Sequence, residues 1–313
     1  MPACPLCRSN HNQELGAVAF NELSDAYQRQ LRMRVTLPDG NEPLRLWRCE
    51  NCDLRFYDPM TTGDEGFYEA LQRFDWYYLA DKEEYGVAAC YIGEHDDVLE
   101  IGSGRAAFAK KIRCASYLGL EFSSSAICMA AEQGIQLVGE TVQAHAVNHP
   151  EQYDVVCSFQ VLEHVSDVRG FIEASLVCLK PGGKLIYSVP NEDGLPGAEI
   201  NNVLNMPPHH VTRWTKTCMQ NLAHEFGLTV LAMEEEKVSD LHVDALSRTL
   251  AQQAFGKFFG WEQRLLDTRY TRRPVRMLVN KVASFLNGPL QDERLRSTGH
   301  SLTCMFQKQS PVT

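Results

Sequence analysis

Positive charge and long apolar runs are both scarce in this sequence of 313 residues. Lys and Arg number 30 against 40 Asp and Glu, which gives a formal net charge of -10. Proteins bind nucleic-acid backbones mainly through a surplus of cationic side chains, so this balance disfavours nucleic acid as a partner. The densest basic stretch, residues 269–276, is expected to be a solvated surface. No segment approaches the about 20 apolar residues of a membrane-spanning helix, so we expect no membrane span.

The first residues also lack the basic start and apolar stretch of a secretory signal, so we expect a cytoplasmic protein. The 11 cysteines are an odd number, which disfavours the paired disulfide framework of a small extracellular domain. The length and the 44% hydrophobic content suit one main domain with an appendage. No pattern in the sequence indicates an oligomeric state.

Four cysteines form two C-x-x-C pairs, Cys4 with Cys7 and Cys49 with Cys52, separated by 41 residues. Two such pairs supply four thiolates, the ligand set of a closed tetrahedral zinc site. The spacing therefore predicts a structural Zn2+ in a zinc-ribbon module over residues 1–62, with a small hairpin between and after the pairs. Four unrelated buried cysteines are one alternative. A redox C-x-x-C is another, but it requires a strand and a helix around it that neither pair has.

Strand-like and helix-like segments alternate after an aromatic, helical linker at residues 63–95. This alternation predicts an α/β fold with a parallel sheet and helices on both faces. The expected strands are 98–101, 117–120, 136–138, 155–159 and 184–189, and the expected helices between them are 106–113, 125–133 and 168–179. Beyond them, a helix is expected at 216–226, strands at 228–238 and 301–307, and a helical insertion at about 240–290.

A glycine-containing turn follows the first of these strands and is suited to holding a small molecule. Gly102 and Gly104 allow a tight turn and close approach of a ligand to the main chain. A dinucleotide site would place a third glycine where Ala106 stands, and the acidic Glu100 before the turn disfavours a diphosphate and favours a cationic ligand. Glu121 ends the second strand about twenty residues later, where a carboxylate can accept both hydroxyls of a ribose.

With these motifs the chain resembles the class I S-adenosylmethionine-dependent methyltransferases. The matching segments are residues 98–104 (VLEIGSG), 117–121 (YLGLE), 153–165 (YDVVCSFQVLEHV) and 179–185 (LKPGGKL), in the order of the family. The resemblance implies a Rossmann-like sheet of seven strands whose last strand is antiparallel, in a methyltransferase domain over residues 96–313. It also implies that S-adenosyl-L-methionine binds across the carboxyl ends of the first strands.

The resemblance further implies which residues bind the cofactor. They are Glu100, Gly102, Ser103 and Gly104 at the first strand and its turn, Glu121 and Phe122 after the second strand, Glu140 and Thr141 after the third, and Ser158, Phe159 and Gln160 at the end of the fourth.

Methyl transfer often requires removal of a proton from the acceptor, and histidine is the natural proton acceptor near neutral pH. His164 follows the fourth strand, and His209 and His210 follow two prolines. In an extended segment adjacent side chains point to opposite faces. We therefore expect only one of His209 and His210 to face the substrate, and the pair is not expected to bind a metal.

The aromatic linker and the segment after the histidine pair are expected to meet the substrate, through Tyr77, Tyr78 and Trp214. A zinc module joined to such a domain is similar to a bacterial group that acts on sugars or other small metabolites. We therefore expect methyl transfer to a hydroxyl or carbon of a small molecule such as a nucleotide-linked sugar. The alternative is a non-catalytic protein that binds S-adenosylmethionine and whose zinc module docks a protein partner.

Overall fold

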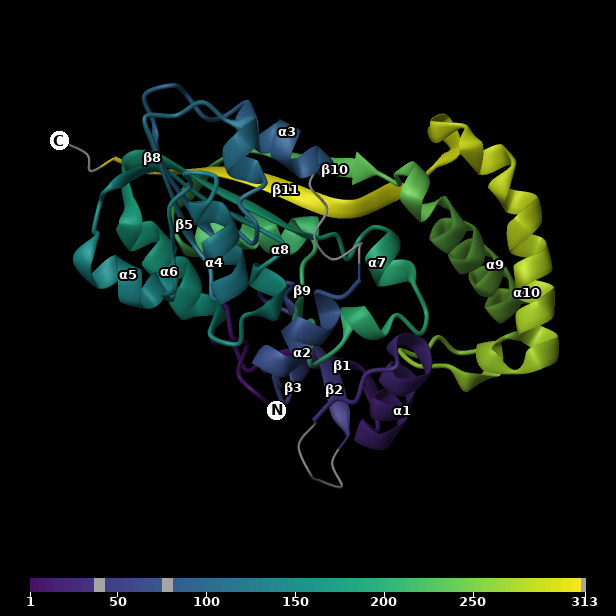
Figure 1. Ribbon diagram of the computed structural model, residues 1–313. Helices are drawn as coiled ribbons and strands as arrows, with labels where there is room; N and C mark the ends of the chain where they lie inside the picture. Colours follow the sequence, from purple (N-terminus) through teal and green to yellow (C-terminus); the bar gives the residue numbers. More distant parts are fainter. Residues whose placement is uncertain (37–42, 75–80, 311–313) are drawn as a thin grey trace.

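The computed structural model describes residues 1–36, 43–74 and 81–310, in which two β-sheets carry helices around them (Figure 1). The larger sheet has the strand order β10-β11-β8-β7-β4-β5-β6. Its strands are β4 (Asp97–Ile101), β5 (Ser116–Leu120), β6 (Leu137–Val138), β7 (Tyr153–Phe159), β8 (Leu179–Pro190), β10 (Leu228–Lys237) and β11 (Thr298–Lys308). The predicted α/β architecture is confirmed.

The strand directions in the larger sheet follow those expected for the family. Neighbouring strands from β8 through β7, β4 and β5 to β6 pair in parallel, whereas β11 pairs antiparallel with both β8 and β10. In register, Ile101 lies opposite both Leu120 and Ser158. The carboxyl ends of β4, β5 and β7 therefore meet at one edge of the sheet, and the chain segments that leave them share one region of space.

Helices connect the strands, and several of those near the large sheet begin at side chains that cap their free N–H groups. Ser123 caps α4 (Ser124–Ala131), Asp167 caps α6 (Val168–Cys178) and Thr215 caps α8 (Lys216–Glu225). The other helices near the large sheet are α3 (Glu83–Ala89), α5 (Val142–Asn148) and α7 (Leu195–Ala198). The helix predicted at 106–113 is wrong, because only a short 3-10 helix over Phe108–Lys111 forms there. Ala106 is left-handed, with φ of 54°, which an α-helix does not allow.

The smaller sheet is antiparallel and joins the N-terminal part of the chain to the segment around residue 212. Its strands are β1 (Asn12–Val18), β2 (Leu44–Cys49), β3 (Arg55–Asp58) and β9 (Thr212–Arg213), and α1 (Phe20–Leu31) and α2 (Glu65–Leu71) belong to the same part of the structure. The Tyr27 hydroxyl, on α1, donates to the carbonyl oxygens of Val203 and Met206 at 2.7 and 3.0 Å. The N-terminal module therefore supports the loop that carries His209 and His210.

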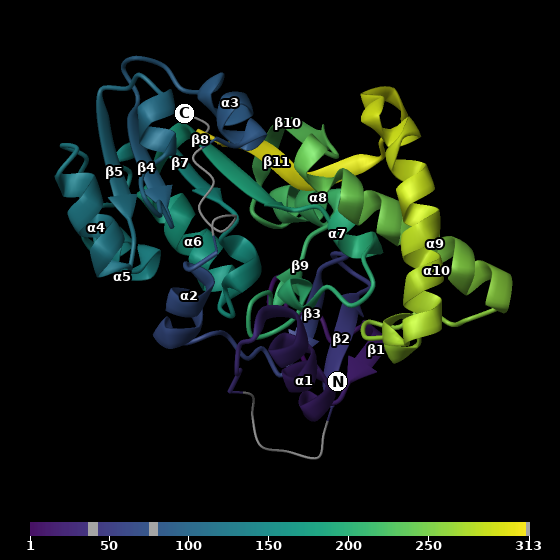
Figure 2. The same cartoon turned by 45° about the vertical axis from the view of Figure 1, so that its right-hand side comes forward.

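Two longer helices, α9 (Val243–Phe259) and α10 (Arg273–Asn287), lie between β10 and β11 in the chain and stand beside the large sheet (Figure 2). Gly260, with φ of 62°, ends α9 in the left-handed conformation that glycine adopts most readily. None of the helices in the described ranges combines the length and apolarity needed to cross a membrane.

Candidate functional site

A large cavity, about 2560 Å³ in volume, lies at the carboxyl ends of the parallel strands. Ile101, Leu120 and Phe159, the last residues of β4, β5 and β7, line one part of it. Arg248 on α9 and Arg276 on α10 line another part. The cavity therefore extends from the edge of the sheet, where open α/β sheets bind ligands, to the inserted helices.

The glycine turn lines this cavity at Gly102, Ser103 and Gly104. Gly102 has φ of 73°, and a Cβ atom at this position would lie 2.4 Å from Cγ2 of Val161. The N–H groups of Gly102 and Ser103 donate to the carbonyl oxygen of Leu120 at 2.8 and 3.1 Å. These bonds tie the turn to β5, and the absence of a side chain at Gly102 lets the turn pack closely against the segment that follows β7.

Glu121 lines the cavity directly after β5 and supports the same turn. One of its carboxylate oxygens accepts the N–H of Gly104 at 2.8 Å, and the other accepts the N–H of Ser123 at 2.8 Å. A carboxylate oxygen can accept more than one hydrogen bond. Glu121 can therefore hold the turn and still receive ribose hydroxyls from a bound nucleoside.

Glu100 and Ser158 do not line the cavity, contrary to the expectation that they contact the cofactor. Each residue is only 1% exposed, and neither is among the residues that line the cavity. Burial raises the pKa of Glu100 to about 8, and its carboxyl group accepts a hydrogen bond from the Tyr117 hydroxyl. Glu100 is therefore a buried acid bonded to Tyr117, and its pKa of about 8 favours the neutral form at pH 7.

The remaining residues predicted to bind the cofactor do line the cavity: Phe122, Glu140, Thr141, Phe159 and Gln160. Phe122 is 68% exposed, as is expected of an aromatic side chain whose partner is a ligand or solvent. The Thr141 hydroxyl caps α5 by accepting the N–H of Ala144 at 3.1 Å. Gln160, with φ of 57°, turns its amide toward Glu84 and Ser301, away from the turn.

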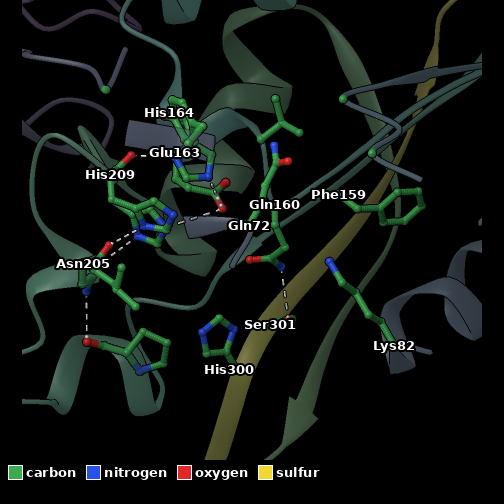
Figure 3. Close-up of a pocket in the computed structure, with 18 of the residues that line it drawn as sticks. Gln72, Lys82, Phe159, Gln160, Glu163, His164, Asn205, His209, His300 and Ser301 are labelled. Carbon is green, nitrogen blue, oxygen red and sulfur yellow. Dashed lines mark hydrogen bonds and ion pairs between the residues drawn. The ribbon is translucent and has the colours of Figure 1, made fainter. Parts of the chain in front are cut away.

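His164, His209 and His210 lie together on the cavity wall, and Figure 3 shows His164 and His209 beside Glu163. One ring nitrogen of each lies within 4.8 Å of a ring nitrogen of the other two. The expectation that His209 and His210 point to opposite faces is wrong. The N–H groups of both residues donate to the same carbonyl oxygen, that of Met206, so the segment turns, and the two rings stack with centroids 4.4 Å apart.

Hydrogen bonds fix the orientation of all three rings. Nδ1 of His164 donates to the carbonyl oxygen of His209 at 2.6 Å, and Nδ1 of His209 donates to that of Leu204 at 2.9 Å. Nδ1 of His210 donates to Oδ1 of Asn205 at 3.1 Å. Since each acceptor requires a hydrogen on Nδ1, each neutral ring carries its lone pair on Nε2.

Burial keeps these rings neutral and also affects the neighbouring acid. Desolvation lowers the pKa of His164 to about 4 and lowers the pKa values of His209 and His210 well below 6.5. Glu163 is 1% exposed, and burial raises its pKa to about 8. Its Oε1 lies 3.7 Å from Nε2 of His164 and 3.9 Å from Nε2 of His210.

Of the three residues predicted to meet the substrate, the structure describes only Trp214. Trp214 is fully buried, and its indole N–H donates to the Thr212 hydroxyl. This residue directly follows β9 and packs in the hydrophobic core instead of lining the cavity. Tyr77 and Tyr78 lie outside the described residues.

The cavity residues that sequence reasoning missed include Glu163, Arg248 and Arg276. Glu163 directly precedes His164, and this adjacency could have indicated it. The two arginines lie in a helical segment without a recognisable motif, so only the packing of α9 and α10 brings them to the cavity.

The four paired cysteines converge at a second place, in the N-terminal module. Sγ of Cys4 lies 3.5 Å from Sγ of Cys52, and Sγ of Cys7 lies 3.5 Å from Sγ of Cys49. All four sulfur atoms lie within 4.8 Å of one another. Ligands of a tetrahedral zinc with bonds of about 2.3 Å lie about 3.8 Å apart, so the arrangement fits the ion.

A family model and similar curated proteins both identify a methyltransferase domain in this chain. A family model described as a methyltransferase domain matches residues 71–233, slightly more than half of the chain. The chain is 32% identical over 170 residues to a ubiquinone biosynthesis O-methyltransferase of Klebsiella pneumoniae, covering 49% of this chain and 67% of that protein. It is 32% identical over 169 residues to the protein of the same name from Citrobacter koseri, with the same coverage.

Solved structures that resemble the chain include an S-adenosylmethionine-dependent methyltransferase from Archaeoglobus fulgidus. Its TM-score is 0.49 at 16% identity, over 78% of this chain and 100% of that chain.

Proposed function

The chain belongs to the S-adenosylmethionine-dependent methyltransferases, and we propose that it methylates a hydroxyl group of a small metabolite that carries phosphate, such as a nucleotide-linked sugar. The observation that carries this proposal is the single cavity that joins the glycine turn and Glu121 to three neutral histidines. The cofactor side and the proton-accepting side are therefore open to one bound acceptor.

The residues at the turn fit the cofactor. Gly102 and Gly104 line the cavity without side chains of their own, and Glu121 lines it where a ribose would lie. S-adenosylmethionine supplies an electrophilic methyl group when it is bound. Glu100, neutral beneath the turn, adds no second negative charge next to Glu121. These residues hold and orient the nucleoside, and the exposed Phe122 offers an apolar surface at its edge.

The histidine cluster accepts the proton that the acceptor hydroxyl loses. As the acceptor oxygen forms its bond to the methyl carbon, the bond from that carbon to sulfur breaks, and the hydroxyl proton passes to an Nε2 lone pair of the cluster. His164 is the most exposed of the three, with 18% of its side chain accessible. A pKa near 4 keeps its Nε2 unprotonated at neutral pH, ready to accept a hydrogen bond from the hydroxyl.

Two observations support the substrate class. The similar proteins from Klebsiella and Citrobacter are named O-methyltransferases, which favours oxygen over carbon as the acceptor atom. Arg248 and Arg276 bring two guanidinium groups to the part of the cavity formed by α9 and α10. Arginine binds phosphate through paired hydrogen bonds, so a phosphate-bearing tail would extend toward these helices.

We also propose that Cys4, Cys7, Cys49 and Cys52 hold a structural Zn2+. Four thiolates leave no open coordination position, so the ion stabilises the module that supports residues 203–213. Metal analysis of the purified chain should find zinc, and at least one equivalent should disappear in Cys49→Ser.

The function is tested with isotope-labelled S-adenosylmethionine and a panel of nucleotide sugars, free sugars and quinol-type phenols. We expect label in a nucleotide-sugar product, at an oxygen. A product from the phenols alone would contradict the substrate class, and label on carbon would contradict the acceptor atom. Tight binding of S-adenosylhomocysteine without any product across the panel would favour a non-catalytic binding protein.

A further inference from the structure

Three histidine side chains present lone pairs to one region of the cavity, although a general base requires only one. The lone pairs are on Nε2 of His164, His209 and His210, because each Nδ1 donates to an oxygen. Oε1 of the Glu163 carboxyl group lies 3.7 Å from Nε2 of His164 and 3.9 Å from Nε2 of His210. Three imidazoles and one carboxylate form a common ligand set for first-row divalent metals.

From this arrangement we propose that His164, His209, His210 and Glu163 bind a divalent cation of the zinc type, at a site separate from the four cysteines. One ring nitrogen of each histidine lies within 4.8 Å of one ring nitrogen of the other two, whereas nitrogen ligands of a tetrahedral zinc lie about 3.4 Å apart. Binding would therefore require the side chains to rotate toward one another.

The hydrogen bonds behind the rings are those that metal-binding histidines make. Metal-binding imidazoles donate their second N–H to a carbonyl or carboxylate oxygen, which fixes the ring and its tautomer. Here the acceptors are the carbonyls of His209 and Leu204 and the side chain of Asn205. Asn205 is itself held, since its amide donates to the carbonyl oxygen of Pro196 at 3.0 Å. The ligands are therefore oriented before any ion arrives.

Glu163 provides an independent indication of a cation. Its carboxyl group is 1% exposed, and its Oε2 has no hydrogen-bond partner. A buried carboxyl oxygen without a partner is costly, and a cation bound by both oxygens of Glu163 would remove that cost. The two segments that carry the ligands are also held together, because Val211 N–H donates to the Glu163 carbonyl oxygen at 2.9 Å.

The consequence for catalysis rests on the proposed function. An acceptor hydroxyl next to the cation would have a lowered pKa and would lose its proton to water in the cavity. The cation would then take the place of a histidine base. Metal binding itself does not depend on this step, so the two ideas can fail separately.

The test uses the full chain with its cysteine site filled by Zn2+, titrated with Co2+. We expect one additional Co2+ to bind and to show the weak d–d bands of nitrogen and oxygen ligands, without the charge-transfer bands of thiolate-bound cobalt. Glu163→Gln should lower this affinity by about 100-fold or more, since even outer partners of metal ligands change affinity by about 10- to 100-fold. The matched control is His224→Gln, at an exposed histidine outside the cavity, which should bind Co2+ as the parent chain does.

S-adenosylhomocysteine binding, measured on the same samples, reports whether Glu163→Gln is folded. Equal Co2+ binding by the parent chain and by folded Glu163→Gln would overturn the proposal, as would a parent chain that shows only thiolate-bound cobalt. Even if Glu163→Gln fails to fold, the Co2+ spectrum of the parent chain shows whether a second metal site with nitrogen and oxygen ligands exists. Metal binding without turnover on any acceptor would instead contradict the proposed function and leave the site intact.

Discussion

Replacing Gly102 by alanine tests the physical basis of the cofactor turn. The residue has φ of 73°, and its new Cβ would lie 2.4 Å from Cγ2 of Val161. Two penalties therefore act together: the left-handed conformation of a residue with a Cβ, and a steric overlap with a short branched side chain that cannot move aside easily. A second glycine separates them, because Gly134 also has φ of 73° but has no atom within 4 Å of the equivalent Cβ position.

The two variants should differ in their free energy of unfolding only by the steric penalty. The left-handed conformation costs about 1–2 kcal/mol, and overpacking a closely packed position costs about 1–3 kcal/mol more. We expect Gly134→Ala to lower the free energy of unfolding by about 1–2 kcal/mol and Gly102→Ala by about 2–5 kcal/mol. Gly102→Ala should also weaken binding of S-adenosylhomocysteine at least tenfold, because the turn must shift away from Val161 and lose its bonds to Leu120.

Urea denaturation measures the unfolding free energies, and calorimetry measures the binding. The double variant Gly102→Ala, Val161→Ala removes the clashing methyl groups, so its destabilisation should be smaller than the sum of the two single changes. Equal destabilisation by Gly102→Ala and Gly134→Ala would refute the steric argument. Unchanged binding by a folded Gly102→Ala would show that the turn does not hold the cofactor.

Three further changes test other parts of the structure. Burial raises the pKa of Glu100 to about 8 from an ordinary value of 4.5, so between these pH values the folded state holds one more proton than the unfolded state. The free energy of unfolding therefore falls as the pH rises through this range. Glu100→Gln should remove about 1.4 kcal/mol of that fall per pH unit, as measured by urea denaturation at pH 5 and pH 8. Arg248→Ala should raise the KM for a phosphate-bearing acceptor about tenfold, because a hydrogen bond to a charged group is lost, while the affinity for S-adenosylhomocysteine stays constant. The control is Arg272→Ala, because Arg272 does not line the cavity. Cys49→Ser should lower the melting temperature and abolish the effect of a strong chelator on it. Cys90→Ser, at an exposed cysteine, should leave both the melting temperature and the chelator effect unchanged.

Local patterns predicted much of the fold. The five parallel strands lie where apolar runs alternate with helical periodicity, and the glycine turn lies directly after β4. The prediction failed between residues 106 and 113, because the left-handed Ala106 interrupts the helical pattern. Such a conformation depends on how the turn packs against its neighbours, and the sequence pattern of residues 106–113 does not reveal it.

The histidine cluster shows a different limit. His164 was indicated by its motif, but its contact with His209 joins residues 45 positions apart in the chain. The direction of the His209 and His210 side chains depends on two N–H groups that share the carbonyl of Met206. Local periodicity assigns alternate faces only to a regular strand, so the grouping could not be predicted.

Sequence alone determined the order along the chain of the strands in the large sheet, the spacing of the four cysteines and the glycine turn, because these depend on neighbouring residues. Tertiary structure decided which side chains share the cavity. It buried Trp214, placed Glu163 beside the histidines and brought Arg248 to the same space from the inserted helices. The physical reason is that these contacts join segments distant in the chain, whose relative positions are determined by packing and long-range hydrogen bonds.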